Sequence, residues 1–421
     1  MASPKKNITV FEHETLSLGS DGKSITPTQL EALQGFYGEK GVPYYSLTHK
    51  GVKFNEYVGV IQVGNTTIEV LPKADKTGDA NKWRSLLISM MRTVGLFSKE
   101  APSSSNLRLR PNSILDLYFE LYISELEGLI RKGLIKKYRR IQGNCNALKG
   151  SINFSKHISK NLIHQERFFV NYTTYDHDHL LHAILLKALK LLSRINSNHI
   201  LSSRINVLLI NFPELKDIQV SESVFNRIIT NRKTSQYSSA LDIAQLILLN
   251  YHPDVISGRD NILALMFNMN MLWEKFVYVS LRKHKPEGST IHAQNKKYFW
   301  KPENGSRSSY MEPDIVLNKG TNDCLVIDTK WKNIGKANPS SNDLRQIYVY
   351  MKYYGAKKVA LVYPGVTSDP RSGNFYKHNP QSMAESDLSQ QECSVISISV
   401  EEDTRKMQKS ISKIVSSWGV L

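Results

Sequence analysis

The sequence contains few cysteines, no long apolar run and fewer acidic than basic residues. Its three cysteines, Cys145, Cys324 and Cys393, are odd in number and far apart. This pattern argues against a disulfide framework or a Cys-x-x-Cys zinc site and favours a reducing, cytoplasmic compartment. Uninterrupted apolar stretches of ~18 residues are absent, so we expect no membrane-spanning segment. The N-terminus also lacks the apolar core of a signal peptide.

The shortage of acidic residues gives the chain a strong positive charge. It has 38 Asp and Glu against 55 Lys and Arg, for a formal net charge of +17. A chain with this much positive charge most often binds a polyanion, and nucleic acid is the commonest polyanion. A basic surface without a partner is the alternative.

The length of 421 residues and a hydrophobic content of 41% allow two or three domains with real cores, at roughly one domain per 150 residues. Pro, Gly and polar residues interrupt two helical patterns at 251–261 and mark the best boundary. We therefore expect a mixed β and helical domain over residues 1–255. Residues 256–421 are expected to form an α/β domain with a mixed sheet flanked by helices, because helical and strand patterns alternate there.

Several local patterns predict individual elements. Residues 26–41 read as a capped helix with Pro27 near its start. Residues 52–72 alternate apolar and polar side chains around Gly64-Asn65, which predicts a hairpin. Residues 262–284 read as one long apolar helix in which Glu274 is the single acid.

The segment 311–332, MEPDIVLNKGTNDCLVIDTKWK, places ionisable residues at the ends of two apolar runs. A turn centred on 319–323 gives a register in which Asp314 lies opposite Asp328, with Cβ atoms ~5 Å apart. Side chains alternate along a strand, so Asp328 and Lys330 share a face and Thr329 points away. The run 325–327 is continuously apolar, which is typical of a central strand covered on both faces.

This arrangement suits phosphodiester hydrolysis. Two carboxylates so close repel each other unless a cation lies between them. Mg²⁺ fits, because it is satisfied by one or two carboxylates together with waters and phosphate oxygens. Lys330 adds a positive group beside the scissile phosphate. The alternative is an ordinary hairpin with exposed end residues, but ionisable groups at the end of a buried strand are costly without a purpose.

These residues carry a resemblance. Pro313-Asp314 followed by Asp328-Thr329-Lys330 resembles the PD-(D/E)xK nuclease signature. Glu274 matches the position of a first acidic residue in that superfamily, and Gln346 and Tyr350 resemble its Gln-x-x-x-Tyr element.

More narrowly, the chain resembles the McrC family, the nuclease subunits of McrBC modification-dependent restriction systems. The strings that carry this resemblance are FNMNMLWEKFV, EPDIVL, LVIDTKWK and DLRQIYVYMKYYGAKKVALVYP in 266–364, with weaker similarity in 57–76 and 143–154. Trp273 and Asn268 depart from the pattern expected before Glu274.

The resemblance implies a Mg²⁺-dependent endodeoxyribonuclease in residues 256–421. Asp314 and Asp328 would be the metal ligands, Lys330 the catalytic lysine, Glu274 an auxiliary acid, and Gln346 and Tyr350 supports for the site or for DNA. It implies two partners, double-stranded DNA containing modified cytosine and a hexameric AAA+ GTPase of McrB type. Residues 1–255 would dock on this GTPase and stimulate it; the GTP belongs to the partner.

Two other functions remain open. One is a stand-alone nuclease whose N-terminal half binds DNA, and the other is a non-catalytic activator of an AAA+ NTPase.

Two further motifs have more than one possible role. DHDHLLH, residues 176–182, reads as a helix capped by Asp176 or Asp178 or, less well, as a metal site. RKGLIKKYRR, residues 131–140, could touch DNA phosphates, dock on an acidic partner, or be a solvated strand.

Overall fold

The computed structural model divides the chain into two compact units. Unit 1 combines residues 1–99 with 253–421, and unit 2 comprises residues 100–252. The predicted boundary near 255 lies close to the second division. Residues 1–255 are not one compact unit, however, because the first 99 residues pack with the C-terminal part. The structure describes residues 6–19, 24–73, 79–95, 114–196, 198–228, 231–252, 261–303, 305, 307–366, 369–377 and 388–419.

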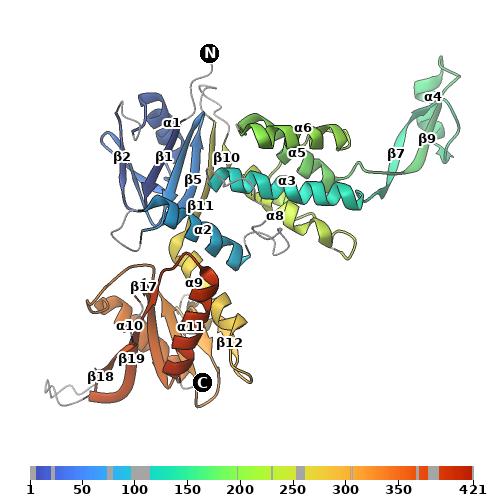
Figure 1. Ribbon diagram of the computed structural model, residues 1–421. Coiled ribbons are helices and arrows are strands. Elements are labelled where there is room, and N and C mark those ends of the chain that lie inside the picture. Colours follow the sequence, from blue (N-terminus) through green and yellow to red (C-terminus); the bar gives the residue numbers. More distant parts are fainter. Residues whose placement is uncertain are drawn as a thin grey trace. The chain divides into compact units, whose positions relative to one another are not determined.

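The first sheet of unit 1 contains the predicted hairpin. Its strands lie in the order β1-β6-β5-β11, with β1 parallel to β6 and the other pairs antiparallel (Figure 1). Gly64 and Asn65 form the turn between β5 and β6, as predicted. The strands are β1 (Lys6–Phe11), β5 (Tyr57–Val63), β6 (Thr66–Leu71) and β11 (Ile262–Asn268).

Helix α1 (Pro27–Tyr37) covers part of this sheet and confirms the predicted capped helix. The Thr26 side chain accepts from the Gln29 amide, Gln29 accepts from the Thr26 amide, and Gly38 follows the last turn. This reciprocal capping box satisfies two backbone donors that would otherwise lack partners at the helix start. A small antiparallel sheet packs beside α1, made of β2 (Thr15–Ser17), β4 (Gly51–Phe54) and β3 (Tyr45–Thr48).

The predicted helix over 262–284 is wrong in its first third. Residues Ile262–Asn268 form strand β11, paired antiparallel with β5, and only Met269–Lys283 form helix α9. A short apolar run fits a buried strand as well as a buried helix, and the pairing with β5 decides between them. Asn268 then caps α9 by accepting from the Met271 amide.

The second sheet of unit 1 confirms the predicted α/β architecture with a mixed sheet. Its order is β12-β15-β16-β17-β19-β18; β16, β17 and β19 are parallel to one another, and β15 is antiparallel to β16. Every residue of β16 is buried. These strands are β12 (Ile291–Ala293), β15 (Ile315–Leu317), β16 (Leu325–Thr329), β17 (Lys358–Gly365), β18 (Arg371–Tyr376) and β19 (Leu388–Ser399).

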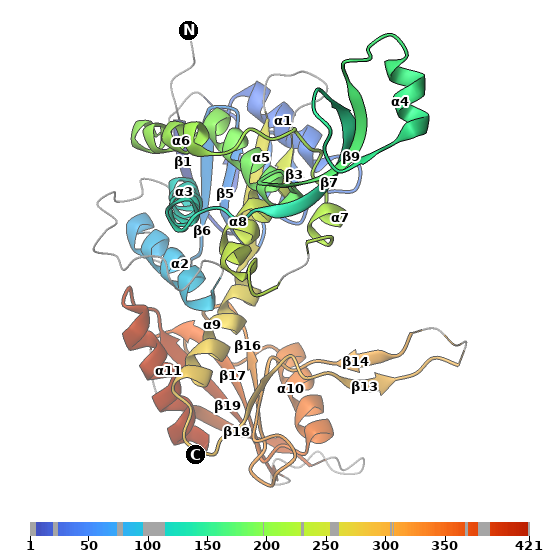
Figure 2. The ribbon, with the colours of Figure 1, turned by 90° about the vertical axis from the view of Figure 1, so that its right-hand side faces the viewer.

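Helices cover both faces of this sheet (Figure 1). Helix α10 (Ser341–Tyr354) packs on β16 and β17, while α9 and α11 (Thr404–Gly419) lie on the opposite face. Helix α2 (Ala80–Val94) packs against α9 and α11, so it joins the first 99 residues to the C-terminal part. A separate two-stranded hairpin, β13 (Lys297–Trp300) and β14 (Ser309–Met311), extends away from the sheet (Figure 2).

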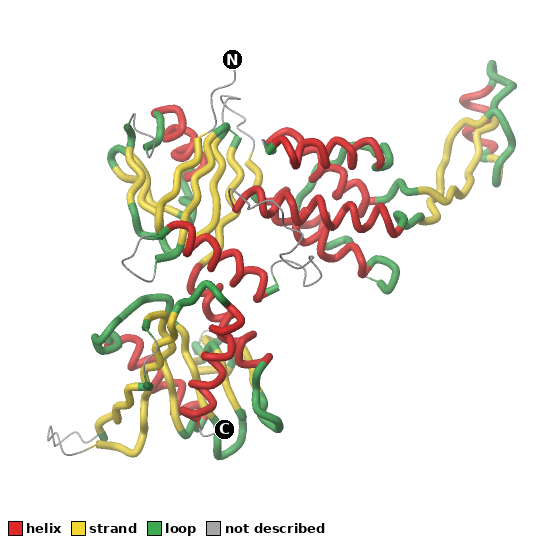
Figure 3. Tube along the Cα trace, in the orientation of Figure 1, coloured by secondary structure: helices red, strands yellow, loops and turns green. Residues whose placement is uncertain are grey.

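Unit 2 is a helical bundle that carries an arm of strands (Figure 3). Strands β7 and β9 pair over nine residues each, and β8 and α4 complete the arm. The bundle helices are α3 (Ile114–Lys132), α5 (Leu180–Ile195), α6 (His199–Asn211), α7 (Glu222–Phe225), η1 (Ser235–Tyr237) and α8 (Ser238–Leu249), followed by β10 (Tyr251–His252). The arm elements are β7 (Lys137–Cys145), β8 (Ser151–Ile152), α4 (Phe154–Asn161) and β9 (Phe168–Asp176).

Two expectations from composition can be compared with the structure. None of the helices in the described ranges is long and apolar enough to span a membrane. All three cysteines are free thiols, with Cys324 and Cys393 buried and Cys145 partly exposed.

Candidate active site

The register predicted for the segment 311–332 is confirmed. Ile315 pairs with Ile327 and Leu317 with Leu325, so one step beyond the ladder Asp314 lies opposite Asp328. Asp314 immediately precedes β15 and Asp328 lies next to last in β16, so both acids are at the same end of the hairpin. Asp328 is almost fully buried, at 2% exposure.

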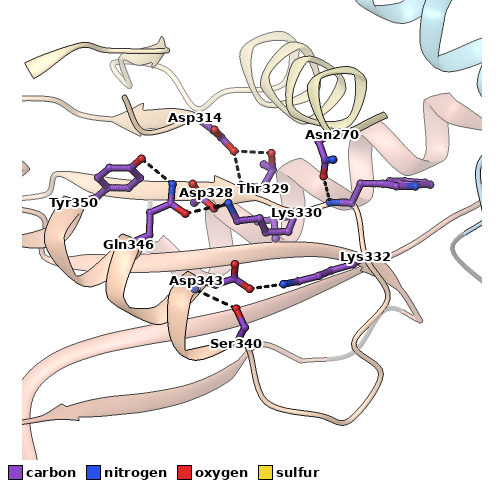
Figure 4. Close-up of polar contacts among 12 residues, drawn as sticks. Asn270, Asp314, Asp328, Thr329, Lys330, Lys332, Ser340, Asp343, Gln346 and Tyr350 are labelled. Carbon is purple, nitrogen blue, oxygen red and sulfur yellow. Dashed lines mark hydrogen bonds and ion pairs between the residues drawn. The ribbon is translucent and has the colours of Figure 1, made fainter. Parts of the chain in front are cut away.

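The predicted role of Thr329 as a residue pointing away from the site is wrong. Its backbone amide donates to Asp314 Oδ2 at 2.6 Å, and its hydroxyl donates to the same oxygen at 2.8 Å (Figure 4). Asp314 precedes β15 rather than lying within it, so its side chain reaches across the end of β16 to Thr329. Thr329 therefore fixes the orientation of the Asp314 carboxylate.

Lys330 connects Asp328 to helix α10. Its Nζ lies 2.9 Å from Asp328 Oδ2 as an ion pair and donates to Gln346 Oε1 at 3.1 Å. The Gln346 amide nitrogen in turn donates to the Tyr350 hydroxyl at 2.9 Å. Gln346 and Tyr350 are one turn apart on α10, so they face the sheet together (Figure 4).

Glu274 joins the site through Gln294. The Gln294 side-chain nitrogen donates to Glu274 Oε1 at 3.1 Å, and its backbone amide donates to the Asp314 carbonyl at 3.0 Å. Gln294 has a positive φ of 46°, a conformation uncommon outside glycine and often found at functional sites. The six predicted site residues thus form two chains of contacts, one around Asp314 and one around Lys330, which meet at the consecutive residues 328–330.

The electrostatics of this set follow from burial and mutual repulsion. Burial raises the pKa of Asp328, and the neighbouring Asp314 raises it further, while Lys330 lowers it in part. Burial likewise raises the pKa of Asp314, against the two hydrogen bonds from Thr329. Burial and the charge of Asp314 raise the pKa of Glu274 to about 7. Burial acts to lower the pKa of Lys330, but Asp328 and Asp314 outweigh it, so the net shift is upward and the ammonium form is favoured.

These residues fit a bound divalent cation. Beyond the effect of burial, Asp314 raises the pKa values of Asp328 and Glu274, and Lys330 offsets only the charges of Asp314 and Asp328, so the ionised site has excess negative charge, which a cation would offset. Across the described ranges, no group of three or more His, Cys, Asp or Glu side chains is arranged to hold a metal by itself. Two carboxylates completed by water and phosphate oxygens are the usual ligand set for Mg²⁺, and the arrangement of Asp314 and Asp328 is compatible with that set.

Sequence reasoning missed the residues that hold the segment after Lys330. The Trp331 amide donates to Asn270 Oδ1 at 3.2 Å, and its indole nitrogen donates to Glu12 Oε1 at 2.7 Å. The Trp331 ring packs edge-on against Trp273 and Trp83, with centroids at 5.4 and 6.5 Å. The unexpected Trp273 is thus a packing partner of the segment that follows β16 and carries Lys330. The Trp in Asp-Thr-Lys-Trp was visible in the sequence, but its partners are far away along the chain.

A second ion pair lies beside the site on α10. Lys332 Nζ is 2.5 Å from Asp343 Oδ2, and the Tyr363 hydroxyl donates to the same oxygen at 3.3 Å. The Ser340 side chain caps α10 by accepting from the Asp343 amide (Figure 4). Asp343 therefore anchors the chain after Trp331 to the start of the helix that carries Gln346.

The motif DHDHLLH in unit 2 has a structural explanation. The predicted cap by Asp176 or Asp178 is wrong, because α5 begins at Leu180 with His179 at its N-cap, and Asp176 instead binds Arg139 and the Asp178 amide. Buried His182 contacts the His177 carbonyl at 2.9 Å and the Tyr237 hydroxyl at 3.3 Å. Burial lowers the pKa of His182 to about 3. These hydrogen bonds account for the histidine without a metal.

Comparisons with known proteins agree with this fold. No curated protein matches the sequence. Over its full length the chain resembles a solved chain from a half-complex of Thermococcus gammatolerans McrB AAA+ hexamers with bound McrC: TM-score 0.73, 18% identity, 98% of this chain and 100% of that one covered. It also resembles a chain of the T. gammatolerans McrBC complex, with TM-score 0.51, 19% identity, and 67% and 89% covered.

A comparison of the sequence with protein-family models identifies the family. A family model described as McrBC 5-methylcytosine restriction system component matches residues 52–364. This range covers most of the chain and includes every candidate site residue, from Glu274 to Tyr350. The chain therefore belongs to the family of McrBC 5-methylcytosine restriction system components.

Proposed function

We propose that this chain is the McrC-type nuclease subunit of a 5-methylcytosine-dependent restriction system. In this proposal it cleaves DNA phosphodiester bonds with Mg²⁺, in a PD-(D/E)xK domain, and stimulates a GTPase partner of McrB type. The observation that carries the proposal is that Asp314 lies opposite Asp328, and Asp328 forms an ion pair with Lys330, at one end of a buried strand. A non-catalytic adaptor would not need these three side chains to meet.

Each residue has a separate task in this proposal. Asp314 and Asp328 would hold the metal, and the two donors of Thr329 would keep Asp314 oriented toward it. When bound, Mg²⁺ offsets the carboxylate charge, lowers the pKa of a coordinated water and stabilises negative charge developing on the phosphate. Lys330 would remain protonated and face the scissile phosphate, held there by Gln346. Glu274, with its pKa raised to about 7, would accept or hold a proton beside Asp314.

The test separates cleavage from partner stimulation. The variant Asp328→Ala should lose cutting of DNA containing modified cytosine, with Mg²⁺, GTP and the partner present. Its stimulation of the partner GTPase should stay unchanged. If purified Asp328→Ala, free of other nucleases, still cuts, the assignment of the site is wrong. Cutting by the wild-type chain with Mg²⁺ alone, without NTP or partner, would instead favour a stand-alone nuclease.

The partner is proposed from the similar structure and from one surface of unit 2. The solved structure that resembles this chain contains McrB AAA+ hexamers with bound McrC, and we transfer that class of partner. The arm of unit 2 exposes several large apolar side chains, a composition typical of interaction surfaces. They are Leu148, Phe154, Ile158, Leu162 and Ile163.

A matched pair of variants tests this surface. Ile163→Asp should weaken stimulation of the GTPase, because it places a charge within the apolar surface of the arm. Val207→Asp is the control, since Val207 is also exposed but lies on α6 of the bundle. Equal stimulation by both variants would place the docking surface elsewhere.

A further inference from the structure

The hairpin β13–β14 exposes aromatic rings that the proposed chemistry does not use. Tyr298 is 78% exposed, Trp300 59% and Tyr310 51%. An isolated two-stranded hairpin is marginally stable in water, and large exposed rings add nothing to its core. Such a cluster is typical of a binding surface.

One face of the hairpin is already occupied by helix α10. The Phe299 ring packs edge-on against Tyr353, with centroids 5.3 Å apart, and the Lys297 ammonium donates to the Tyr353 carbonyl. These contacts hold the hairpin against the helix that carries Gln346 and Tyr350. The hairpin is therefore attached to a rigid element of the site.

The other face presents an aromatic pair and a cation. Tyr298 and Tyr310 are directly opposite in the strand register, so their rings share a face. The Lys296 ammonium lies 4.6 Å from the centroid of the Tyr310 ring. This face combines flat π-surfaces with positive charge, the combination that single-stranded nucleic acid binding requires.

Charge and position both favour a nucleic acid. The segment 294–312 contains four cationic residues and two acids, Glu303 and Glu312. Glu312 forms a partly exposed ion pair with Lys296 at 3.7 Å, and the segment keeps a net positive charge. Both strands of the hairpin adjoin the candidate active site. Lys296 is two residues beyond Gln294, which contacts Glu274 and Asp314, and Met311 is three residues before Asp314. Figure 2 shows the hairpin extending outward from this part of the sheet.

We propose that the hairpin β13–β14 binds unpaired bases of DNA beside the cleavage site, with bases stacked on Tyr298 and Tyr310. Stacking requires an unpaired base, because the faces of paired bases are covered within a duplex and only phosphates and groove edges are accessible. Lys296 and the neighbouring cations contact the backbone of the same strand. This inference rests on the proposed nuclease function, since it takes DNA as the ligand.

The experiment measures binding without cleavage. Full-length protein is titrated into a fluorescent 20-nucleotide oligo(dT) and into a duplex of equal length, in EDTA, and anisotropy is recorded. Tyr298→Ala and Tyr310→Ala should each weaken oligo(dT) binding roughly tenfold, given the usual contribution of one stacked base, with less effect on the duplex. Tyr298→Phe should restore binding, because the ring is kept. Tyr376→Ala is the control, as Tyr376 is exposed on β18 outside the hairpin.

The outcomes separate this inference from the proposed function. Unchanged oligo(dT) binding by both alanine variants overturns the inference, even if the wild type cuts DNA. If the wild-type chain never cuts DNA but binds oligo(dT), and the alanine variants bind it more weakly, the inference is supported and the nuclease proposal fails. If the variants bind DNA normally but lose self-association or GTPase stimulation, the hairpin is a protein interface and the inference is wrong.

Discussion

The indole nitrogen of Trp331 donates to Oε1 of Glu12 at 2.7 Å, although 319 positions separate the two residues in the chain. The same oxygen accepts from the Lys73 amide at 2.8 Å. Glu12 follows β1 and Lys73 follows β6, so one buried carboxylate links the ends of two strands of the first sheet to the residue after Lys330. The site of the second sheet is thus supported by the N-terminal part of unit 1.

Glu12 should make the stability of the protein depend on pH. Burial raises its pKa above the ordinary 4.5, against the hydrogen bonds from Lys73 and Trp331. The folded protein therefore binds this proton more tightly than the unfolded chain does. The contribution of Glu12 to stability is fully present below pH 4.5 and is lost as the pH rises through the folded pKa. The Glu12→Gln variant has no ionisable group at this position, so its stability lacks this dependence on pH.

The measurement compares urea unfolding midpoints of wild type and Glu12→Gln at pH 5 and pH 8. Wild type should lose stability relative to the variant at the higher pH. A difference that stays constant with pH would mean that Glu12 has the same pKa in both states.

Thr329 should control the affinity for the metal rather than the chemistry. Thr329→Val removes the hydroxyl that donates to Asp314 but keeps the shape of the side chain. Loss of such an outer partner of a ligand typically costs about 10–100-fold in metal affinity or activity. We expect a higher Mg²⁺ concentration for half-maximal cleavage, with cleavage at saturating Mg²⁺ largely recovered. Thr329→Ser should behave as wild type, and equal Mg²⁺ requirements for Val and Ser would refute this role.

Gln346 should act by positioning Lys330. Gln346→Ala removes the acceptor of the Lys330 ammonium and should slow DNA cleavage about 10–100-fold, without weakening DNA binding measured in EDTA. Tyr350→Phe removes the hydroxyl that accepts from Gln346 and donates to the Glu312 carbonyl, but it keeps Gln346 against Lys330, so its effect should be smaller. A larger effect for Tyr350→Phe than for Gln346→Ala would mean that the hydroxyl acts by a route other than Gln346, and this role of Gln346 would be wrong.

Gly59 should be indispensable for the pairing of β5 with β11. Its φ is 138°, and a Cβ there would lie 2.1 Å from the Leu265 carbonyl oxygen, a backbone atom. Gly59→Ala should therefore destabilise unit 1 by about 3 kcal/mol or more, through strain and a broken ladder. Gly35→Ala is the control: a Cβ at this helical position meets no described atom within 4 Å and should be neutral or stabilising by up to about 1 kcal/mol. Thermal unfolding of both variants gives the comparison.

Local patterns in the sequence determined much of the fold. The capped helix that starts at Pro27 and the turn at Gly64-Asn65 each depend on residues close together in the chain, and both were predicted correctly. The spacing of Asp314 and Asp328 around a short turn likewise determined their register, since a hairpin pairs residues at equal distances from its turn. The resemblance then associated Glu274, Gln346 and Tyr350 with these acids.

Only the tertiary structure decided the remaining points. Residues 262–268 could form a helix or a strand by periodicity, and β5, some 200 residues earlier, made them a strand. The alternation of side chains along a strand predicted that Thr329 points away from the site. Asp314, however, precedes the regular ladder, and its side chain reaches across to Thr329. Glu12 contacts Trp331, and the first 99 residues pack with the C-terminal part. These contacts join segments far apart in the chain, and sequence periodicity does not indicate such contacts. Long-range contacts of this kind depend on the three-dimensional arrangement of the strands and helices, which local sequence patterns do not specify.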